Sequence, residues 1–122
     1  MDNKDMYREH IIDSYKHPHN FGNLPHPTHA CREFNPFCGD DITMQLVVKE
    51  GIIEKVTFNG KGCALSVAAA SMLTDKIKGM NVEDIKKMSK EDILELLKIP
   101  IGPVRLKCAL LSLETLHKAL ER

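Results

Sequence analysis

Two alternating apolar segments joined by a Glu-Gly pair limit the possible folds of this chain more than any other feature. Residues 42–49 alternate between apolar and polar side chains, and residues 52–59 continue the same kind of pattern. A period of two is typical of a strand with one buried face. Glu50-Gly51 between the segments favours a tight turn. The sequence therefore predicts an antiparallel hairpin, and a third strand is expected within residues 30–35. The side chains expected on its buried face are Ile42, Met44, Leu46, Val48, Val56 and Phe58.

Helical patterns lie on both sides of this hairpin. Residues 3–16 form one, which Pro18 ends, and residues 64–78 form another, which Gly79 ends. Asn81 and Ser89 each suit the cap of a short helix, the first through residue 87 and the second ending before Pro100. Pro103 suits the first turn of a last helix that runs to about Leu120.

This order of elements predicts an α+β fold. We expect an N-terminal helix, a small three-stranded antiparallel sheet, and C-terminal helices packed on one face of the sheet. The 122 residues are enough for one modest core, so we expect a single domain over residues 1–122.

Charge and apolar content exclude several classes of partner. Lys plus Arg and Asp plus Glu both total 17, and this balance argues against a nucleic-acid partner. We see no apolar run long enough to span a bilayer, and the polar N-terminus does not resemble a signal peptide. We therefore expect no membrane partner and a cytoplasmic location. In that reducing compartment, cysteines serve as buried thiols, metal ligands or sulfur carriers rather than in disulfides. The four are Cys31, Cys38, Cys63 and Cys108, and none forms a CxxC pair.

Cys38 lies in a short turn-like segment with Gly39 and Asp40. Gly39 permits an unusual backbone angle, so the side chains of Cys38 and Asp40 can converge on one ion. The alternative is a turn cysteine beside a capping aspartate. The local residues favour neither interpretation.

Cys63 directly precedes the long helix and follows two glycines, Gly60 and Gly62. A helix N-terminus offers unpaired N–H groups and a positive dipole end, both of which favour a thiolate. The glycines leave the sulfur uncovered. A bare turn and a phosphate-binding loop are the alternatives, and we prefer the thiolate.

The other two cysteines differ in their surroundings. Cys108 falls outside the main apolar stripe of the last helix, on a face with Val104, Leu111 and Thr115, although it can still pack against a second layer. Cys31 has no Gly, Asp or helix end around it and is expected to be structural. Three thiolates and the Asp40 carboxylate would make four ligands, which suits tetrahedral zinc or an iron–sulfur unit.

Four of the six histidines fall between residues 17 and 29. A metal-collecting loop is one interpretation of this cluster. We prefer solvated or capping histidines, which are more common.

Three motifs with cysteines at fixed places resemble those of a known family. "NPFCGDDI" is similar to NPxCGDxI, "FNGKGCALSVAAASMLT" to FxGxGCxISxASASMMT, and "PVRLKCALLSLETL" to PxRxKCAxLxxxxL. The opening "MYREHIIDSYKHPHNFG" resembles the first helix and loop of the same family. The chain therefore resembles the iron–sulfur cluster assembly scaffold proteins of the IscU/SufU type, also found as the N-terminal domain of NifU.

This resemblance implies a site and an activity. The site would consist of Cys38, Asp40, Cys63 and Cys108, with Cys31 outside it. A transient [2Fe–2S] cluster would be built from iron and from sulfur supplied by a cysteine desulfurase. One of the three site cysteines would first accept that sulfur as a persulfide. The cluster would then pass to apo-proteins or carrier proteins, so the protein would be a carrier rather than an enzyme.

The resemblance also leaves an enzymatic alternative, a zinc-dependent sulfurtransferase of the SufU type. Lys107, where the IscU branch has His, favours it. Proteins of the SufU type carry an insertion between the second and third cysteines. Residues 79–100 are too few to hold this insertion, and its absence counts against the alternative. A structural zinc module is a third, weaker hypothesis. The chaperone-binding segment LPPVK of the IscU branch is replaced here by residues 101–105, IGPVR, which weakens the case for a DnaK-type chaperone partner.

Overall fold

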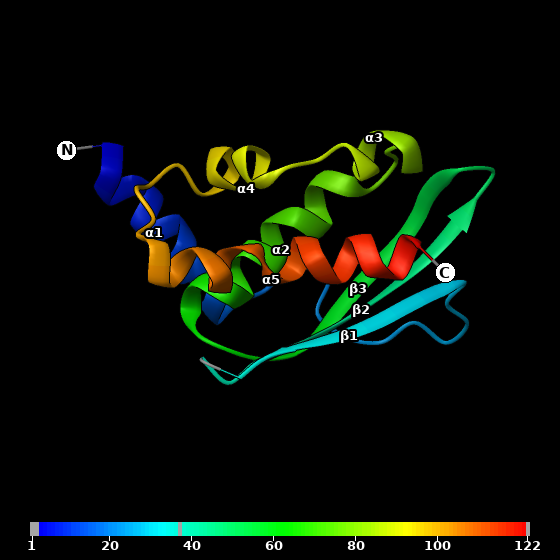
Figure 1. Ribbon diagram of the computed structural model, residues 1–122, viewed down its shortest axis with the longest axis horizontal. Coiled ribbons are helices and arrows are strands. Elements are labelled where there is room, and N and C mark those ends of the chain that lie inside the picture. Colours follow the sequence, from blue (N-terminus) through cyan, green and yellow to red (C-terminus); the bar gives the residue numbers. More distant parts are fainter. Residues whose placement is uncertain (1–2, 37, 122) are drawn as a thin grey trace.

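The order of elements in the computed structural model (Figure 1) is the one that the sequence predicts, over the described residues 3–36 and 38–121. An N-terminal helix precedes a three-stranded antiparallel sheet, and four helices follow it. The elements are α1 (Asn3–Lys16), β1 (His29–Asn35), β2 (Asp40–Lys49), β3 (Ile52–Lys61), α2 (Ala64–Ile77), α3 (Val82–Lys86), α4 (Lys90–Leu97) and α5 (Pro103–Leu120). The α+β prediction is confirmed.

The sheet has β2 at its centre, with β1 and β3 as its two edges. Glu50 and Gly51 both have positive φ angles, 53° and 78°, which two-residue hairpin turns of type I′ require. The register shifts between Val47 and Val48, so Val48 is only half-buried instead of facing fully inward as predicted. The other inward residues of the hairpin are buried as expected.

Helices α2 and α5 lie against one face of the sheet, while α3 and α4 lie on the far side of those two helices (Figure 1). The alternation of the strands explains this packing, because one face of the sheet is apolar and needs cover. Most of the core forms one cluster between the sheet and the helices. A second, smaller cluster consists of Ile42, Phe58, Val67, Ala70 and Leu111.

The loop between α1 and β1 is fastened to α2 by hydrogen bonds that involve side chains. Asn20 has a left-handed backbone with φ of 62°, and its Nδ2 donates to Thr74 Oγ1 (3.0 Å) and to Asp75 Oδ1 (2.9 Å). His19 Nδ1 lies 2.6 Å from Asp75 Oδ2. Burial raises the pKa of Asp75, but the hydrogen bonds from His19 and Asn20 outweigh it, so that this pKa is lowered. His19 thus helps to fasten this loop to α2.

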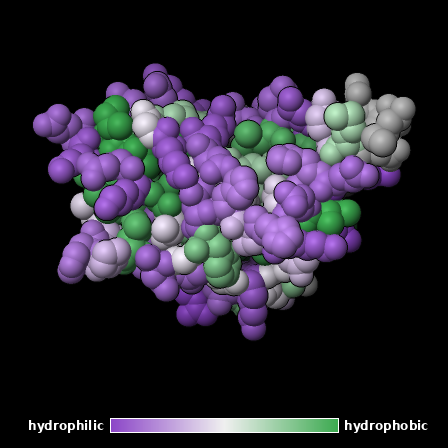
Figure 2. Space-filling view, turned by 180° about the vertical axis from the view of Figure 1, so that it is seen from behind, coloured by the Kyte–Doolittle hydropathy of each residue, from purple (hydrophilic) through white to green (hydrophobic). Residues whose placement is uncertain are grey.

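The surface seen from behind is mainly hydrophilic, with small separate hydrophobic groups (Figure 2). Among the described residues, no helix combines the length and apolar character that crossing a membrane demands. The large apolar side chains instead fill the interior, where residues such as Phe58, Leu73 and Leu116 are fully buried.

Candidate functional site

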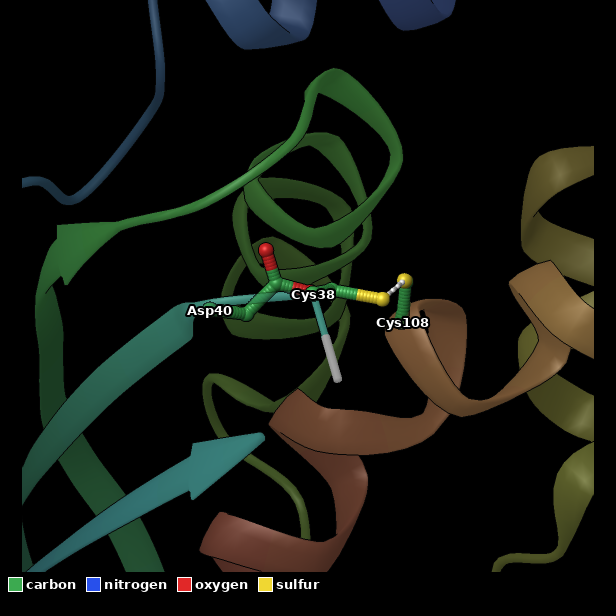
Figure 3. Close-up of side chains that lie close together, drawn as sticks. All are labelled: Cys38, Asp40 and Cys108. Atoms are coloured by element: carbon green, nitrogen blue, oxygen red, sulfur yellow. Dashed lines mark hydrogen bonds between the residues drawn. The ribbon is translucent and has the colours of Figure 1, made fainter. Parts of the chain in front are cut away.

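Cys38, Asp40 and Cys108 meet at one end of the sheet, where the segment between β1 and β2 approaches α5 (Figure 3). One ligand atom from each residue lies within 4.8 Å of the other two. The Sγ atoms of Cys38 and Cys108 are 2.9 Å apart, although 70 positions separate the two residues along the chain. Within the described part of the chain, this is the group of cysteine, histidine and acidic side chains that a metal ion could bridge, and it contains no histidine.

The alternation of β2 places Asp40 in this site. Asp40 is the first residue of β2, pairs with Asn35 of β1, and faces inward like Ile42 two residues later. Gly39 has a φ of 73°, which lets the chain turn from Cys38 into the strand, and its N–H donates to the carbonyl of Asn35 (2.8 Å). Asp40 is consequently fully buried, whereas Cys38 is exposed in the turn before it.

The two oxygens of Asp40 have different surroundings. Oδ1 accepts a hydrogen bond from the backbone N–H of Cys63 (2.9 Å). Oδ2 is buried and, among the described residues, has no hydrogen-bond partner. An unpaired buried carboxylate oxygen is costly, and a bound cation would satisfy it. Figure 3 shows one carboxylate oxygen turned toward the side of the two sulfur atoms.

Cys63 borders this group from the N-terminus of α2. It is the N-cap residue of that helix, as the sequence predicts, and its Sγ accepts the N–H of Ser66 (3.4 Å). Its sulfur is not one of the three atoms within 4.8 Å of one another, but it lies close enough to the Cys108 thiol to influence it. The site therefore has three converging groups and a fourth at its edge.

Cys108 differs from the expectation in being almost fully buried, at 3% exposure. It does lie on the face of α5 that it shares with Leu111 and Thr115, outside the main apolar stripe. Leu111 and Thr115 are buried too, because the sheet and α2 both pack against α5, whereas Val104, which the sequence places on the same face, is 82% exposed in the first turn of the helix. Burial is the largest cause that raises the pKa of the Cys108 thiol, and the nearby Cys38, Asp40 and Cys63 side chains add to it.

Cys31 lies outside the site. It is buried in β1, opposite Met44 of β2, and belongs to the main core cluster. The sequence-based expectation of a structural cysteine agrees with this position.

The donor set fits a metal ion that accepts sulfur and oxygen ligands. Thiolates bound to zinc at about 2.3 Å in a tetrahedron are about 3.8 Å apart, so the Cys38 and Cys108 sulfurs need to separate by only about 1 Å. Cys38 lies in an exposed turn, which allows such a movement. The buried Asp40 oxygen supplies the matching hard ligand.

A mainly apolar pocket of about 360 Å³ opens beside Cys38. Its lining also includes Asn35 from the end of β1 and Pro103, Val104 and Lys107 from the first turns of α5. These neighbours belong to two of the cysteine motifs, but the sequence does not show that the two motifs meet, because they are far apart along the chain. The pocket gives a second molecule access to Cys38, while Cys108 stays covered.

Comparisons with known proteins cover nearly the whole chain. A family model described as the NifU-like N terminal domain matches residues 6–122. The zinc-dependent sulfurtransferase SufU of Bacillus subtilis is 35% identical over 134 residues, covering 96% of this chain and 90% of that protein. The iron-sulfur cluster assembly scaffold protein IscU of Escherichia coli (strain K12) is 31% identical over 118 residues, covering 93% of this chain and 91% of that protein.

A crystal structure of a hypothetical protein has the same fold, with a TM-score of 0.84 and 29% identity over 98% of this chain and 99% of that one. Sequence and fold thus agree from the first helix to the last.

Proposed function

Because the chain belongs to the family of NifU-like N-terminal domains, we propose that it is a single-domain scaffold, residues 1–122, for iron–sulfur cluster assembly. It accepts sulfur that originates at a cysteine desulfurase, binds iron, and holds a transient [2Fe–2S] cluster as its cargo. Apo-proteins or carrier proteins then receive that cluster. In this role the protein is a carrier rather than an enzyme.

The observation that carries the proposal is the unpaired Oδ2 of Asp40 beside two cysteine sulfurs. Cys38, Asp40, Cys63 and Cys108 are the proposed ligands. Three thiolates suit iron, and the carboxylate is a harder ligand that exchanges more readily than a fourth thiolate. A site of this kind holds its cargo and can also release it.

The difference in exposure among the cysteines supports Cys38 as the first sulfur acceptor. Cys38 is exposed beside an open pocket, whereas Cys108 is buried. The Cys38 thiolate attacks the outer sulfur of a desulfurase persulfide and forms a new S–S bond. The bond to the desulfurase cysteine breaks, and that cysteine leaves as a thiolate, so no external oxidant or reductant is needed.

Anaerobic reconstitution with iron and sulfide, followed by absorption spectroscopy, tests the scaffold function. We expect the parent protein to develop the visible bands of a [2Fe–2S] chromophore, and the Cys63→Ser variant to develop far weaker ones. A parent protein that stays colourless would exclude the scaffold function. So would a Cys63→Ser variant that assembles a cluster as well as the parent.

A zinc-dependent sulfurtransferase is the second candidate, favoured by Lys107 and by the similarity to a relative of that name. Zinc held by the same four side chains would orient their thiolates for sulfur transfer. Against this candidate, the alignment with the Bacillus subtilis protein is longer than the 122 residues of this chain, so that relative contains residues without a counterpart here. Strong stimulation of a desulfurase by the zinc form, lost when zinc is stripped, would favour the sulfurtransferase.

A further inference from the structure

Gly62 lies against the buried carboxylate of Asp40. A Cβ atom at this position would be 2.7 Å from Asp40 Oδ1 and 3.1 Å from Asp40 Cγ. It would also lie 3.2 Å from the hydroxyl oxygen of Ser66. Non-bonded carbon and oxygen atoms do not approach to 2.7 Å without strain. Any side chain at position 62 would therefore displace the carboxylate or the backbone that holds it.

Space, not an unusual backbone angle, is what position 62 requires. The positive-φ glycines among the described residues are Gly22, Gly39, Gly51, Gly60 and Gly79. Gly62 is not one of them, so another residue could adopt its backbone conformation. Gly102 also lacks a positive φ, and a Cβ there would meet nothing within 4 Å. These two glycines differ in what surrounds them, and Gly102 is thus a matched control for Gly62.

The surroundings of Asp40 restrict how far its carboxylate can move away from a side chain at position 62. Asp40 and Ser66 are both fully buried. The Cys63 N–H that holds Oδ1 belongs to the peptide unit that directly follows Gly62. A methyl group at position 62 would thus push on the carboxylate at the oxygen that this N–H holds.

From these contacts we propose that Gly62 is a positioning residue that acts through Asp40. Because it has no side chain, the carboxylate can lie against the chain just before α2 and accept the Cys63 N–H through Oδ1. Oδ2 then remains as the oxygen available to a metal ion. The inference rests on the proposed function, since it assumes that Asp40 is a ligand.

Zinc affinity and the absorption spectrum of the cobalt(II)-substituted protein test this role. We expect Gly62→Ala to raise the Kd for zinc about 10- to 100-fold, the usual effect of disturbing a group that orients a ligand. The d–d bands of its cobalt form should shift toward those of Asp40→Ala. Gly102→Ala should leave both the Kd and the spectrum unchanged.

A double-mutant cycle separates this role from a general loss of structure. In an Asp40→Ala background the carboxylate is gone, so adding Gly62→Ala should change the Kd by less than about twofold. If the fold-changes in Kd caused by the two single substitutions multiply in full in the double variant, the proposal is wrong. It is also wrong if the cobalt spectrum of Gly62→Ala is identical to that of the parent. If Gly62→Ala alone fails to fold, the double variant should regain the cooperative melt of Asp40→Ala. A double variant that also fails to fold would overturn the proposal.

The same data distinguish failure of the proposed ligand set from failure of this inference. If Asp40→Ala leaves the cobalt spectrum unchanged, Asp40 is not a ligand and the proposed site is wrong. If Asp40→Ala changes the spectrum but Gly62→Ala does not, only the positioning role of Gly62 is wrong.

Discussion

Asp40 and Asp41 differ in role because successive residues of a strand point to opposite faces. Asp40 faces the helices and keeps one oxygen without a partner. Asp41 faces the other way, and Arg32 donates to both of its oxygens, at 2.8 and 2.6 Å. The Asp40 side chain thus suits the proposed ligand role, while the Asp41 side chain stabilises the pairing of β1 with β2.

The ion pair with Arg32 makes the contribution of Asp41 to stability depend on pH. The hydrogen bond from Arg32 is the main cause that lowers the pKa of Asp41. The ion pair therefore stabilises the protein fully at pH values above the pKa of Asp41 in the unfolded chain, about 3.9. This stabilisation is lost as the pH falls through the lower pKa that Asp41 has in the folded protein. We expect Asp41→Asn to lose less stability than the parent when urea denaturation is repeated from pH 6 down to pH 3.

Arg32→Gln should reduce the same pH dependence, because it removes the partner that lowers this pKa. Parallel stability curves for the parent and Asp41→Asn over the acidic range would contradict this assignment.

Exposure should decide which cysteine reacts first in the metal-free protein. Cys38 is exposed, whereas burial covers Cys108 and raises its pKa, so less of it is thiolate at neutral pH. We expect iodoacetamide to modify Cys38 at least about tenfold faster than Cys108, as followed by peptide mass spectrometry. Added zinc should protect Cys38. Equal rates for the two cysteines would show that the site is more open than the structure indicates.

At the scale of elements, the bounds of α5 could be predicted from the sequence, but the burial of Cys108 within it could not. The start of α5 follows from a local signal, Pro103, and its end agrees with the expectation of about Leu120. The burial of Cys108 does not follow from such a signal. Periodicity identifies the strongest apolar face, but neighbours on two sides bury a second face of this helix.

The position of Asp40 could have been predicted from the strand pattern. The alternation of the inward residues, continued two positions before Ile42, places Asp40 on the buried face. The contact between Cys38 and Cys108 has no comparable local signal, because it joins segments 70 residues apart. The setting of each cysteine and the resemblance to a family suggested that grouping, but neither is a signal that the two segments meet. Nor does any sequence pattern indicate the register shift at Val47 and Val48.

The loop before β1 depends on the side chain of Asn20. Asn20 holds a left-handed backbone angle and makes two side-chain hydrogen bonds to α2. We expect Asn20→Ala to lower the free energy of unfolding by about 2 kcal/mol, from the lost bonds and the unfavourable angle. Asn20→Gly tolerates the angle and should cost about 1 kcal/mol. Chemical denaturation measures both, and equal losses would mean that the backbone angle contributes nothing.

At the scale of the whole molecule, we expect the core to form without a metal ion, although Cys63 packs against it. The main cluster of buried residues lies between the sheet and the helices and does not include Cys38, Asp40 or Cys108. A structural zinc module without its metal would unfold as a whole. This chain has a core of its own, and it is expected to stay folded.

Chelation should therefore lower the melting temperature without abolishing cooperative unfolding. Zinc at a free concentration 100 times its Kd should stabilise the protein by about 2.7 kcal/mol, or roughly 10 °C in melting temperature. Circular dichroism of zinc-loaded and chelated samples measures this difference. Loss of the far-ultraviolet signal on chelation would favour the structural zinc module instead.

The proposed scaffold function requires that Cys38, Asp40, Cys63 and Cys108 together hold an iron–sulfur cluster and that Cys31 does not. Native mass spectrometry of anaerobically reconstituted protein tests it most directly, because apo, zinc and cluster forms differ in mass. We expect a [2Fe–2S] mass for the parent and for the matched control Cys31→Ser, but mainly the apo mass for Cys63→Ser. A parent protein found only at the apo mass, or a Cys63→Ser variant that carries as much cluster as the parent, would contradict it.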